Sequence, residues 1–595
     1  MKKRSEILDK YKWTFDDYFK NDDEWNKSYE KFSKDIYNIK YFYGKLTDKK
    51  QILSCLKTLE VLSIQAEALY IYANCMSNLD ISNAKYQVFL SKIEQKFTEK
   101  SEISSFIEPQ LGLLNDEFLD DMINDSAFCD FTKILRDVKR EKIHILSEES
   151  EKLLSSTGTF SSNFSNNFSN FEDGDLKYNF VKNSKGKELK MSNSLAMMYL
   201  QNKDETLREN AYKELQQAHG RFNNFLTSNY LGSVRKDVFY AKARKFNSSL
   251  EGALFYEEVG QNVYDNLIKN VEDNLHLNQK YFQIKQSLFG LKQFKLSDLF
   301  YCPLKLKSKY SYDNSVEIVC SALAILGDDY VSYIRFMAEN RMIDVFPTEN
   351  KTSGAYEIMA SKKTPRVLLN FVGTFNDVST LAHELGHAMH SVFSNKHQSS
   401  INSSYTIFLA EIASTVNEIL LNNYMSEKVK SRDEKMYFIN QFLSECYSTI
   451  FRQTMFANFE EKIHSKVEKN EDLSTEILNS IYLELVKKYF GKKVKIFDEV
   501  KYEWSRIPHF YNEFYVYKYA TGFISAINIV ENLTSGKISV DDYKKFLSSG
   551  CTDVPTELLK IVKVNFDTEE PFKTAFEYIE GKLKLFNSLE KKKKL

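Results

Sequence analysis

The chain has 595 residues, and its 81 Lys and Arg against 82 Asp and Glu give no electrostatic case for a nucleic-acid partner or an anionic membrane. Gly and Pro are scarce, at 19 and 7 residues, which favours a mostly α fold with few tight turns. We expect no signal peptide, because the first residues are charged and lead into no apolar run, and no transmembrane helix, because no run of about 18 apolar residues occurs.

The seven cysteines are scattered along the chain and form no CxxC pair. This pattern argues against a disulfide framework and against a cysteine zinc site, and it fits a reducing compartment. We therefore expect the protein to be cytoplasmic.

Helical spacing dominates the first half of the chain. Charged and apolar positions alternate with a helical period through residues 1–110, and more helices are expected up to residue 200. A short hairpin is expected over residues 180–189, and helical patterns return over 200–345. At the other end of the chain, residues 581–595 form a basic tail.

Two short segments before residue 375 predict a pair of adjacent strands. The first contains Gly354, Ala355 and Tyr356, and the second runs from Arg366 to Phe371 and is rich in apolar residues. An edge strand can hold an extended peptide by β-augmentation, which makes Gly354, Ala355, Tyr356 and Asn370 candidate substrate contacts. A small sheet with a purely structural role would give the same pattern.

The most informative stretch is Leu-Ala-His-Glu-Leu-Gly-His-Ala-Met-His, in which His383 and His387 lie four residues apart. On a helix these two imidazoles project from one face and can converge on one metal ion. Glu384 stands beside the pair, where it can take a proton from a metal-bound water. Asn376 and Asp377 are the candidate N-cap residues of this helix. A surface helix could match the five-residue pattern by chance.

A third ligand would distinguish a metal centre from a chance match. Glu411 follows 24 residues after His387 on a second helical pattern, and two histidines, one carboxylate and a water make a catalytic zinc site. Glu418 shares the face of Glu411 and is either an acceptor for a ligand imidazole or a solvated carboxylate. Gly386 costs helix stability, so we expect another segment to approach it closely. His390 is either a substrate contact or a packed histidine.

A run of aromatic residues from 506 to 522 holds His509 and several tyrosines. Buried phenols need hydrogen-bond partners, so a run of this density exceeds what a core requires. A tyrosine hydroxyl can donate to the oxyanion of a tetrahedral intermediate, and a histidine can do the same or orient a substrate. Tyr519 is the first candidate and Tyr515 the second. The alternative is an aromatic helix packed in the core.

Together these motifs resemble oligoendopeptidase F, a branch of the thimet oligopeptidase and neurolysin family of zinc peptidases. The resemblance rests on the order and spacing of motifs over about residues 350–525, which include Ser-Gly-Ala-Tyr, His-Glu-Leu-Gly-His, Phe-Leu-Ala-Glu-Ile-Ala-Ser-Thr and Pro-His-Phe-Tyr…Tyr-Val-Tyr-Lys-Tyr-Ala-Thr-Gly. It implies a mostly α fold with two lobes about a deep central channel and a small β-sheet beside the metal helix.

The resemblance also implies a function. The chain is expected to be a zinc-dependent endopeptidase that cleaves short unstructured oligopeptides, with Glu384 activating a zinc-bound water and His383, His387 and Glu411 holding one Zn²⁺ per chain. The expected domains are a helical region (1–110), an oligopeptidase F N-terminal-type domain (111–200), a catalytic zinc peptidase domain (201–580) and the basic tail (581–595). A monomer or weak homo-oligomer is expected, with no nucleic-acid or membrane partner.

Two other functions would use the same metal motif. A zinc amidase could act on small molecules, although the paired strands favour an extended peptide. A helical scaffold could retain the metal for stability alone, but such a site has no need of Glu384.

Overall fold

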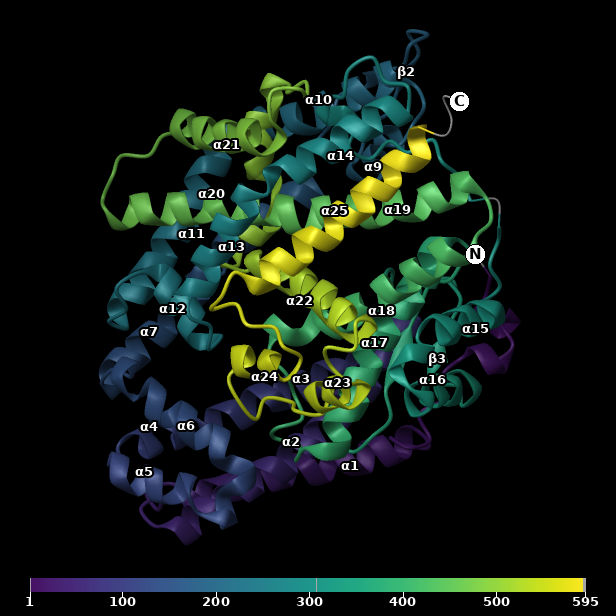
Figure 1. Cartoon of the computed structure of the whole chain (residues 1–595). Helices are drawn as coiled ribbons and strands as arrows, with labels where there is room; N and C mark the ends of the chain where they lie inside the picture. Colours follow the sequence, from purple (N-terminus) through teal and green to yellow (C-terminus); the bar gives the residue numbers. More distant parts are fainter. Residues whose placement is uncertain (1, 307, 592–595) are drawn as a thin grey trace. The chain divides into compact units, whose positions relative to one another are not determined.

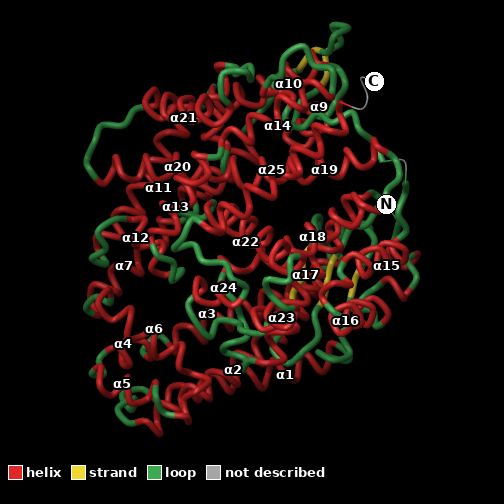
Figure 2. The backbone as a smooth tube through the Cα atoms, viewed as in Figure 1, coloured by secondary structure: helices red, strands yellow, loops and turns green. Residues whose placement is uncertain are grey.

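The computed structural model describes residues 2–306 and 308–591, and it confirms the mostly helical fold predicted from the sequence (Figures 1 and 2). Residues 592–595 of the predicted basic tail lie outside the described residues. The chain divides into two compact units. Within the described ranges, no helix combines the length and the apolar character that crossing a bilayer requires.

Unit 1 comprises Met1–Ile145, Lys307–Tyr424 and Asn532–Lys563. It contains His383, Glu384, His387 and Glu411 of the metal motif. Its helices are α1 (Asp22–Asp35), α2 (Lys49–Leu79), α3 (Ala84–Ser104), α4 (Ile107–Gly112), α5 (Asp116–Ile123), α6 (Thr132–Glu141), α15 (Tyr312–Ala322), α16 (Asp328–Glu339), α17 (Phe375–His397), α23 (Val540–Leu547) and α24 (Pro555–Ile561), together with most of α18 (Ile407–Lys428).

Unit 2 comprises Leu146–Leu306, Met425–Glu531 and Val564–Leu595. It contains the aromatic run. Its helices are α7 (Glu148–Ser161), α8 (Asn163–Asn170), α9 (Asn193–Leu200), α10 (Glu205–Gly220), α11 (Asn223–Ala243), α12 (Ser249–Tyr256), α13 (Gln261–Asp273), α14 (Leu275–Leu288), α19 (Arg432–Cys446), α20 (Arg452–Glu468), α21 (Thr475–Phe490) and α25 (Glu570–Lys591), together with most of α22 (Tyr517–Thr534). The predicted hairpin is confirmed as β1 (Val181–Lys182) and β2 (Glu188–Leu189), which pair antiparallel.

A three-stranded sheet lies beside the metal helix in unit 1, where the sequence predicted a small sheet with a pair of adjacent strands. Its strands are β3 (Ile343–Asp344), β4 (Tyr356–Ile358) and β5 (Arg366–Leu368), in the order β3-β5-β4. The β4 strand runs antiparallel to β5, with Glu357 opposite Val367, and β3 runs parallel to β5. Helix α17 contacts both β4 and β5. The sheet therefore has a short edge strand beside this helix, where a further strand could pair.

The amino-terminal helices of unit 1 form their own apolar core. Trp25 is fully buried, stacks on Phe89 with ring centroids 4.1 Å apart, and donates its indole N–H to the Leu69 carbonyl at 2.9 Å. Leu368 of β5 belongs to the same core cluster. Because this cluster reaches from the first helices to the sheet, the sheet beside α17 rests on a closely packed base.

Helix α17 begins at a capping box, although not where the sequence predicted. The N-cap is Thr374, whose hydroxyl accepts from the Asp377 amide, while the Asp377 carboxylate accepts from the Thr374 N–H at 2.7 Å. The expected N-caps, Asn376 and Asp377, lie inside the first turn. The prediction was wrong because Thr374 has extended backbone and so takes the cap position, leaving Asp377 as its reciprocal partner.

Candidate metal centre

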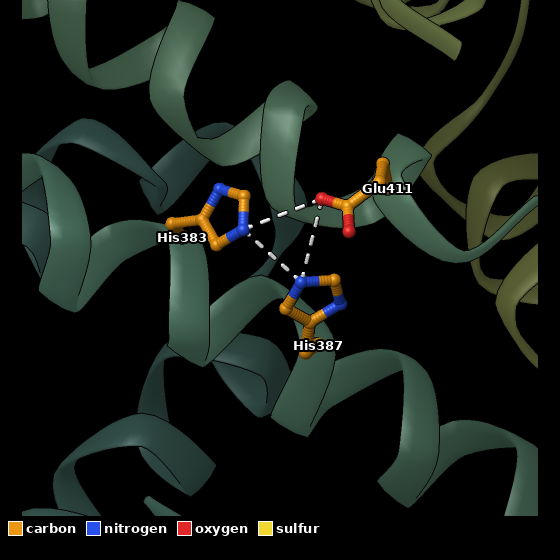
Figure 3. Close-up of side chains that lie close together, drawn as sticks. All are labelled: His383, His387 and Glu411. Atoms are coloured by element: carbon orange, nitrogen blue, oxygen red, sulfur yellow. Dashed lines mark hydrogen bonds and ion pairs between the residues drawn. The ribbon is translucent and has the colours of Figure 1, made fainter. Parts of the chain in front are cut away.

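Two histidines of α17 turn their side chains toward one point. His383 Nε2 and His387 Nε2 lie 3.1 Å apart (Figure 3). This follows from helical geometry, because residues four apart share one face. The buried apolar face of α17, which includes Leu381, Leu385 and Ala388, fixes the rotation of the helix and so the direction of both imidazoles.

Glu411 of α18 completes the group. Its Oε2 lies 3.4 Å from His383 Nε2 and 3.6 Å from His387 Nε2 (Figure 3). These three residues form the one cluster of His, Cys, Asp and Glu in the described part of the chain whose ligand atoms all lie within 4.8 Å of one another. Two imidazole nitrogens and one carboxylate oxygen are the ligand set of a catalytic zinc site.

Gly386 explains how α18 comes close enough. A Cβ placed at this residue would lie 2.4 Å from the Cα of Ser414 and 2.7 Å from the carbonyl oxygen of Ala413. No side chain fits there, which confirms the close approach expected from the sequence. One turn further on, the Asn417 side chain donates to the Ala382 carbonyl at 3.0 Å. The two helices are therefore held together along the face that carries the candidate ligands.

Glu418 contacts the candidate ligand His383 and is not a fully solvated carboxylate. Its Oε2 lies 3.1 Å from His383 Nδ1, and its Oε1 accepts from the Ser379 hydroxyl at 3.2 Å. A carboxylate in this place fixes the tautomer in which Nε2 of His383 carries the free lone pair. Ser379 was not predicted, although its position four residues before His383 places it on the same helical face.

The electrostatics of the group suit a cation. Burial opposes a charge on His383, but hydrogen bonds to Glu411 and Glu418 outweigh it and raise the pKa of His383 to about 11. Burial, and then the charge on His383, lower the pKa of His387 to about 4. The hydrogen bond to His383 lowers the pKa of Glu411. Carboxylates therefore lie on both sides of the His383 ring, and a divalent cation fits between the same ligand atoms.

Glu384 lies beside the group and is 6% exposed. Burial raises its pKa to about 7, and a backbone hydrogen bond from Glu357 of β4 opposes that rise. A carboxyl with a pKa near neutrality can both take and return a proton, which is what a general base that later acts as an acid requires.

The sheet side of the site holds a carboxyl that the sequence analysis missed. Glu357 accepts from the Ser391 hydroxyl at 3.3 Å, and Ser391 also lies 3.3 Å from the Tyr405 hydroxyl. Burial raises the pKa of Glu357 to about 8. Strand alternation contains a signal for it, because Glu357 must face away from the side that Tyr356 occupies.

The candidate substrate contacts lie on the same edge. Tyr356 opens β4, and its hydroxyl accepts from the Asn78 side chain at 2.9 Å. Asn370 donates to the carbonyls of Thr352 and Gly354, so it supports the segment that leads into β4. His390 is buried and stacks on Tyr405 with ring centroids 3.7 Å apart, which is a packed environment.

The aromatic run belongs to unit 2, where it separates into two kinds of tyrosine. His509 Nε2 lies 3.2 Å from the Tyr519 hydroxyl, and the Tyr515 ring lies 6.0 Å and 5.4 Å from the rings of His509 and Tyr519. Tyr511 instead accepts from the Asn229 side chain at 3.1 Å, and Tyr517 is buried. Burial lowers the pKa of His509. The structure thus groups His509, Tyr515 and Tyr519, the residues selected from the sequence.

The fold and this histidine-carboxylate group define a helical metallopeptidase, and comparison with known proteins identifies the family. Residues 198–578 match the model of peptidase family M3, and residues 111–178 match the oligopeptidase F model. Oligopeptidase PepF of Bacillus subtilis is 33% identical over 98% of this chain and 87% of its own length. Group B oligopeptidase PepB of Streptococcus agalactiae is 31% identical over 98% of this chain and 97% of its own length.

Solved structures agree with the sequence comparison. A crystal structure from Chlamydophila abortus covers 99% of this chain and 100% of its own, with 33% identity and a TM-score of 0.92. Oligoendopeptidase-F from Enterococcus faecium covers 96% and 99%, with 27% identity and a TM-score of 0.73. The chain therefore belongs to peptidase family M3, and it is a metalloendopeptidase whose substrates are oligopeptides.

Proposed function

We propose that this protein is a zinc-dependent endopeptidase that hydrolyses internal peptide bonds of short unstructured oligopeptides. The observation that carries the proposal is the convergence of His383, His387 and Glu411 within 4.8 Å, in a chain of this family. These three residues would hold the ion. Bound there, zinc supplies a Lewis acid that polarises the scissile carbonyl and lowers the pKa of a water to about 7.

The chain's own residues supply the proton transfers. Glu384 takes a proton at its carboxylate from the attacking water and later gives it to the leaving amine. Glu418 holds His383 through Nδ1, so that Nε2 faces the ion. Removing Glu418 would therefore weaken the site without removing any group that touches the ion.

The hydroxyl of Tyr519 and the imidazole of His509 are proposed to stabilise the oxyanion, with Tyr515 as the second candidate. Their mutual contact at 3.2 Å supports a shared role, because a hydroxyl and an imidazole that bond to each other can also reorient together toward a new acceptor. Donors of this kind act most strongly in the transition state.

The substrate is proposed to pair with the β4 edge, where Gly354, Ala355 and Tyr356 offer backbone and Asn370 supports the segment. A deep central channel that excludes folded proteins and the domain boundaries given above remain predictions. We also propose that the enzyme works in the cytoplasm as a monomer or weak homo-oligomer. The seven cysteines, all of them free, support a reducing compartment.

One experiment tests the function. The purified protein is assayed for zinc by mass spectrometry and for turnover of a quenched fluorogenic peptide, before and after chelation and zinc restoration. Stoichiometric zinc and restored turnover are expected. An amidase and a scaffold would both carry zinc and spare the peptide, and turnover of a small fluorogenic amide, assayed in parallel, separates these two alternatives. Efficient internal cleavage of a stable folded protein would contradict selection for unstructured peptides.

A further inference from the structure

The loop between residues 511 and 517 has an unusual backbone at its centre. Phe514 has a φ of 48°, and it is the one aromatic residue among the non-glycine residues of the described chain that have positive φ. Contacts between Cβ and the backbone disfavour this region for bulky residues. Since Phe514 is also buried, its conformation persists only because neighbouring groups hold it.

Glu460 of α20 is the group that holds the Phe514 backbone. Its Oε1 accepts the Phe514 N–H at 2.6 Å, and the side chain is fully buried. No hydrogen-bond partner in the described structure reaches its Oε2. A buried carboxyl costs stability unless its hydrogen bonds compensate, so a carboxyl with this one bond calls for a reason to be there. Burial raises the pKa of Glu460 to about 8.

The Phe514 ring packs against a buried histidine of α20. His464 lies one turn after Glu460 on α20, and its ring centroid is 4.5 Å from that of Phe514. Its Nδ1 donates to the Glu460 carbonyl at 2.9 Å, and its Nε2 lies 3.3 Å from the Asp237 carboxylate of α11. Burial opposes a charge on His464, but Asp237 outweighs it and raises the pKa of His464 to about 9. The ring is thus fixed at both nitrogens.

The backbone conformation of Phe514 determines the position of the next side chain, that of Tyr515. Tyr515 follows directly, and its ring centroid lies 6.0 Å from that of His509 and 5.4 Å from that of Tyr519. Those two side chains contact each other at 3.2 Å across the loop. A change of φ at Phe514 toward the ordinary negative region would swing Tyr515 away and leave the His509 and Tyr519 pair without its aromatic neighbour.

We propose that Glu460 is a positioning residue for peptide hydrolysis: by accepting a hydrogen bond from the Phe514 amide, it holds the loop that places Tyr515 beside His509 and Tyr519. This inference rests on the function proposed above. His464 and Asp237 act behind Glu460 and keep the Phe514 ring in place. The whole network lies within unit 2.

Two substitutions of Glu460 separate the effect of losing its hydrogen bond from the effect of changing its side-chain volume. Glu460→Gln keeps an acceptor of the same size, and Glu460→Leu keeps the bulk but has no acceptor. The Leu variant should lower kcat by about 10- to 100-fold with KM nearly unchanged, because small misplacements of catalytic groups cost rates of this order. The Gln variant should stay within about threefold of the wild type. If Glu460 acts through Tyr519, its loss should cost much less in a Tyr519→Phe background.

Hydrogen exchange of the segment 510–516 gives a readout independent of turnover. Exchange should be faster in Glu460→Leu than in the wild type and in Glu460→Gln. The matched control is Asp298→Asn, which breaks the buried pair between Asp298 and Arg208, whose atoms lie 2.8 Å apart in the same unit. It should lower the thermal midpoint but leave both kcat and the exchange of this segment unchanged. Glu460→Met replaces the Leu variant if that protein does not fold.

The outcomes are distinct. Equal exchange and equal kcat in the Leu and Gln variants would overturn the proposal. So would a failure of both the Leu and Met variants to fold while the Gln variant folds normally, because Glu460 would then serve global stability. If the wild type hydrolyses no peptide, the proposed function fails, and the exchange data alone decide whether Glu460 holds the loop.

Discussion

Two helices of this protein each place a histidine four residues after another ionisable side chain and use it in opposite ways. On α17, His383 and His387 lie four residues apart and point their Nε2 atoms at each other, 3.1 Å apart, with the Glu411 carboxylate opposite. On α20, Glu460 and His464 are also four residues apart, yet each ring nitrogen of His464 has its own partner.

The difference lies in where the lone pairs point. At His383, His387 and Glu411, three ligand atoms converge on one point, which a cation can occupy. Each ring nitrogen of His464 already has a hydrogen-bond partner, so this ring has a structural role in the core. Residue types and spacing are similar in the two places, and only convergence separates a candidate metal centre from a structural network. The predictions that follow test this contrast, beginning with the largest expected effect.

Glu384→Gln should abolish most turnover and leave zinc in place. The amide has nearly the same shape as the carboxyl but cannot accept the proton from the attacking water. We expect kcat to fall at least about 1,000-fold, near the upper part of the range for a general base. Zinc content by mass spectrometry is the control, measured on the same samples. Near-normal turnover of a zinc-loaded variant would show that another group takes the proton.

Tyr519→Phe should come next in size. An oxyanion donor acts in the transition state, so kcat should fall by about 100- to 1,000-fold with little change in KM. The matched control is Tyr511→Phe, which loses its bond from Asn229 and should cost about 1 kcal/mol of stability with kcat unchanged.

Tyr515→Phe is measured in parallel with Tyr519→Phe. If neither variant lowers kcat by about tenfold, well short of the loss for a single donor, the tyrosines are packing residues and the oxyanion role passes to His509 alone.

Glu418→Gln should weaken zinc binding without abolishing it. The amide can no longer hold His383 Nδ1 through a charged acceptor, and loss of such partners costs about 10- to 100-fold in metal affinity. Glu411→Ala removes a direct ligand and should cost more. Competition with a chelator of known affinity gives the dissociation constants.

The control for Glu418 comes from the other histidine environment. Asp237→Asn changes the carboxylate beside His464, so zinc affinity should stay at the wild-type value. If Glu411→Ala keeps stoichiometric metal at low zinc, the third ligand lies elsewhere, and Glu418 is the first place to look.

The sequence was sufficient where structure is local or periodic. The mostly helical fold, the hairpin over 180–189 and the two strands beside the metal helix follow from spacing and turn residues. The convergence of His383 and His387 follows from a four-residue interval on one helix. Gly386 was even informative about a distant segment, because only a close approach accounts for glycine between two candidate ligands.

What the sequence did not predict depends on long-range contacts. The N-cap of α17 is an exception, because Thr374 takes it through a local capping box with Asp377, a pattern that the sequence contains and the prediction missed. Asp237 and His464 are 227 residues apart, and no local pattern pairs them. The conformation of Phe514 depends in the same way on Glu460, 54 residues earlier in the chain.

The last prediction concerns the dependence of stability on pH, and it tests the buried network of Asp237, His464 and Glu460. The pKa of His464 is raised to about 9 from an ordinary value near 6.5, so its contribution is fully present below about pH 6.5 and is lost as pH rises through about 9. Burial raises the pKa of Glu460 to about 8 and that of Glu513, the residue before Phe514, to about 7. A raised carboxyl pKa also makes stability fall with rising pH. All three shifts have the same sign, so the unfolding free energy should decline as the pH rises from about 4.5, the ordinary pKa of the two carboxyls, to about 9, the raised pKa of His464.

Asp237→Asn tests the origin of that decline. Without the carboxylate, the pKa of His464 should fall toward its ordinary range, and burial should then favour the neutral ring. The variant should be less stable than the wild type at pH 6.5 and should approach it near pH 9.5, as measured by urea unfolding at each pH. A slope equal to that of the wild type would mean that His464 is neutral in the native protein. The network would then be held at His464 by the hydrogen bonds of a neutral ring, in contrast to the converging ligand atoms on α17.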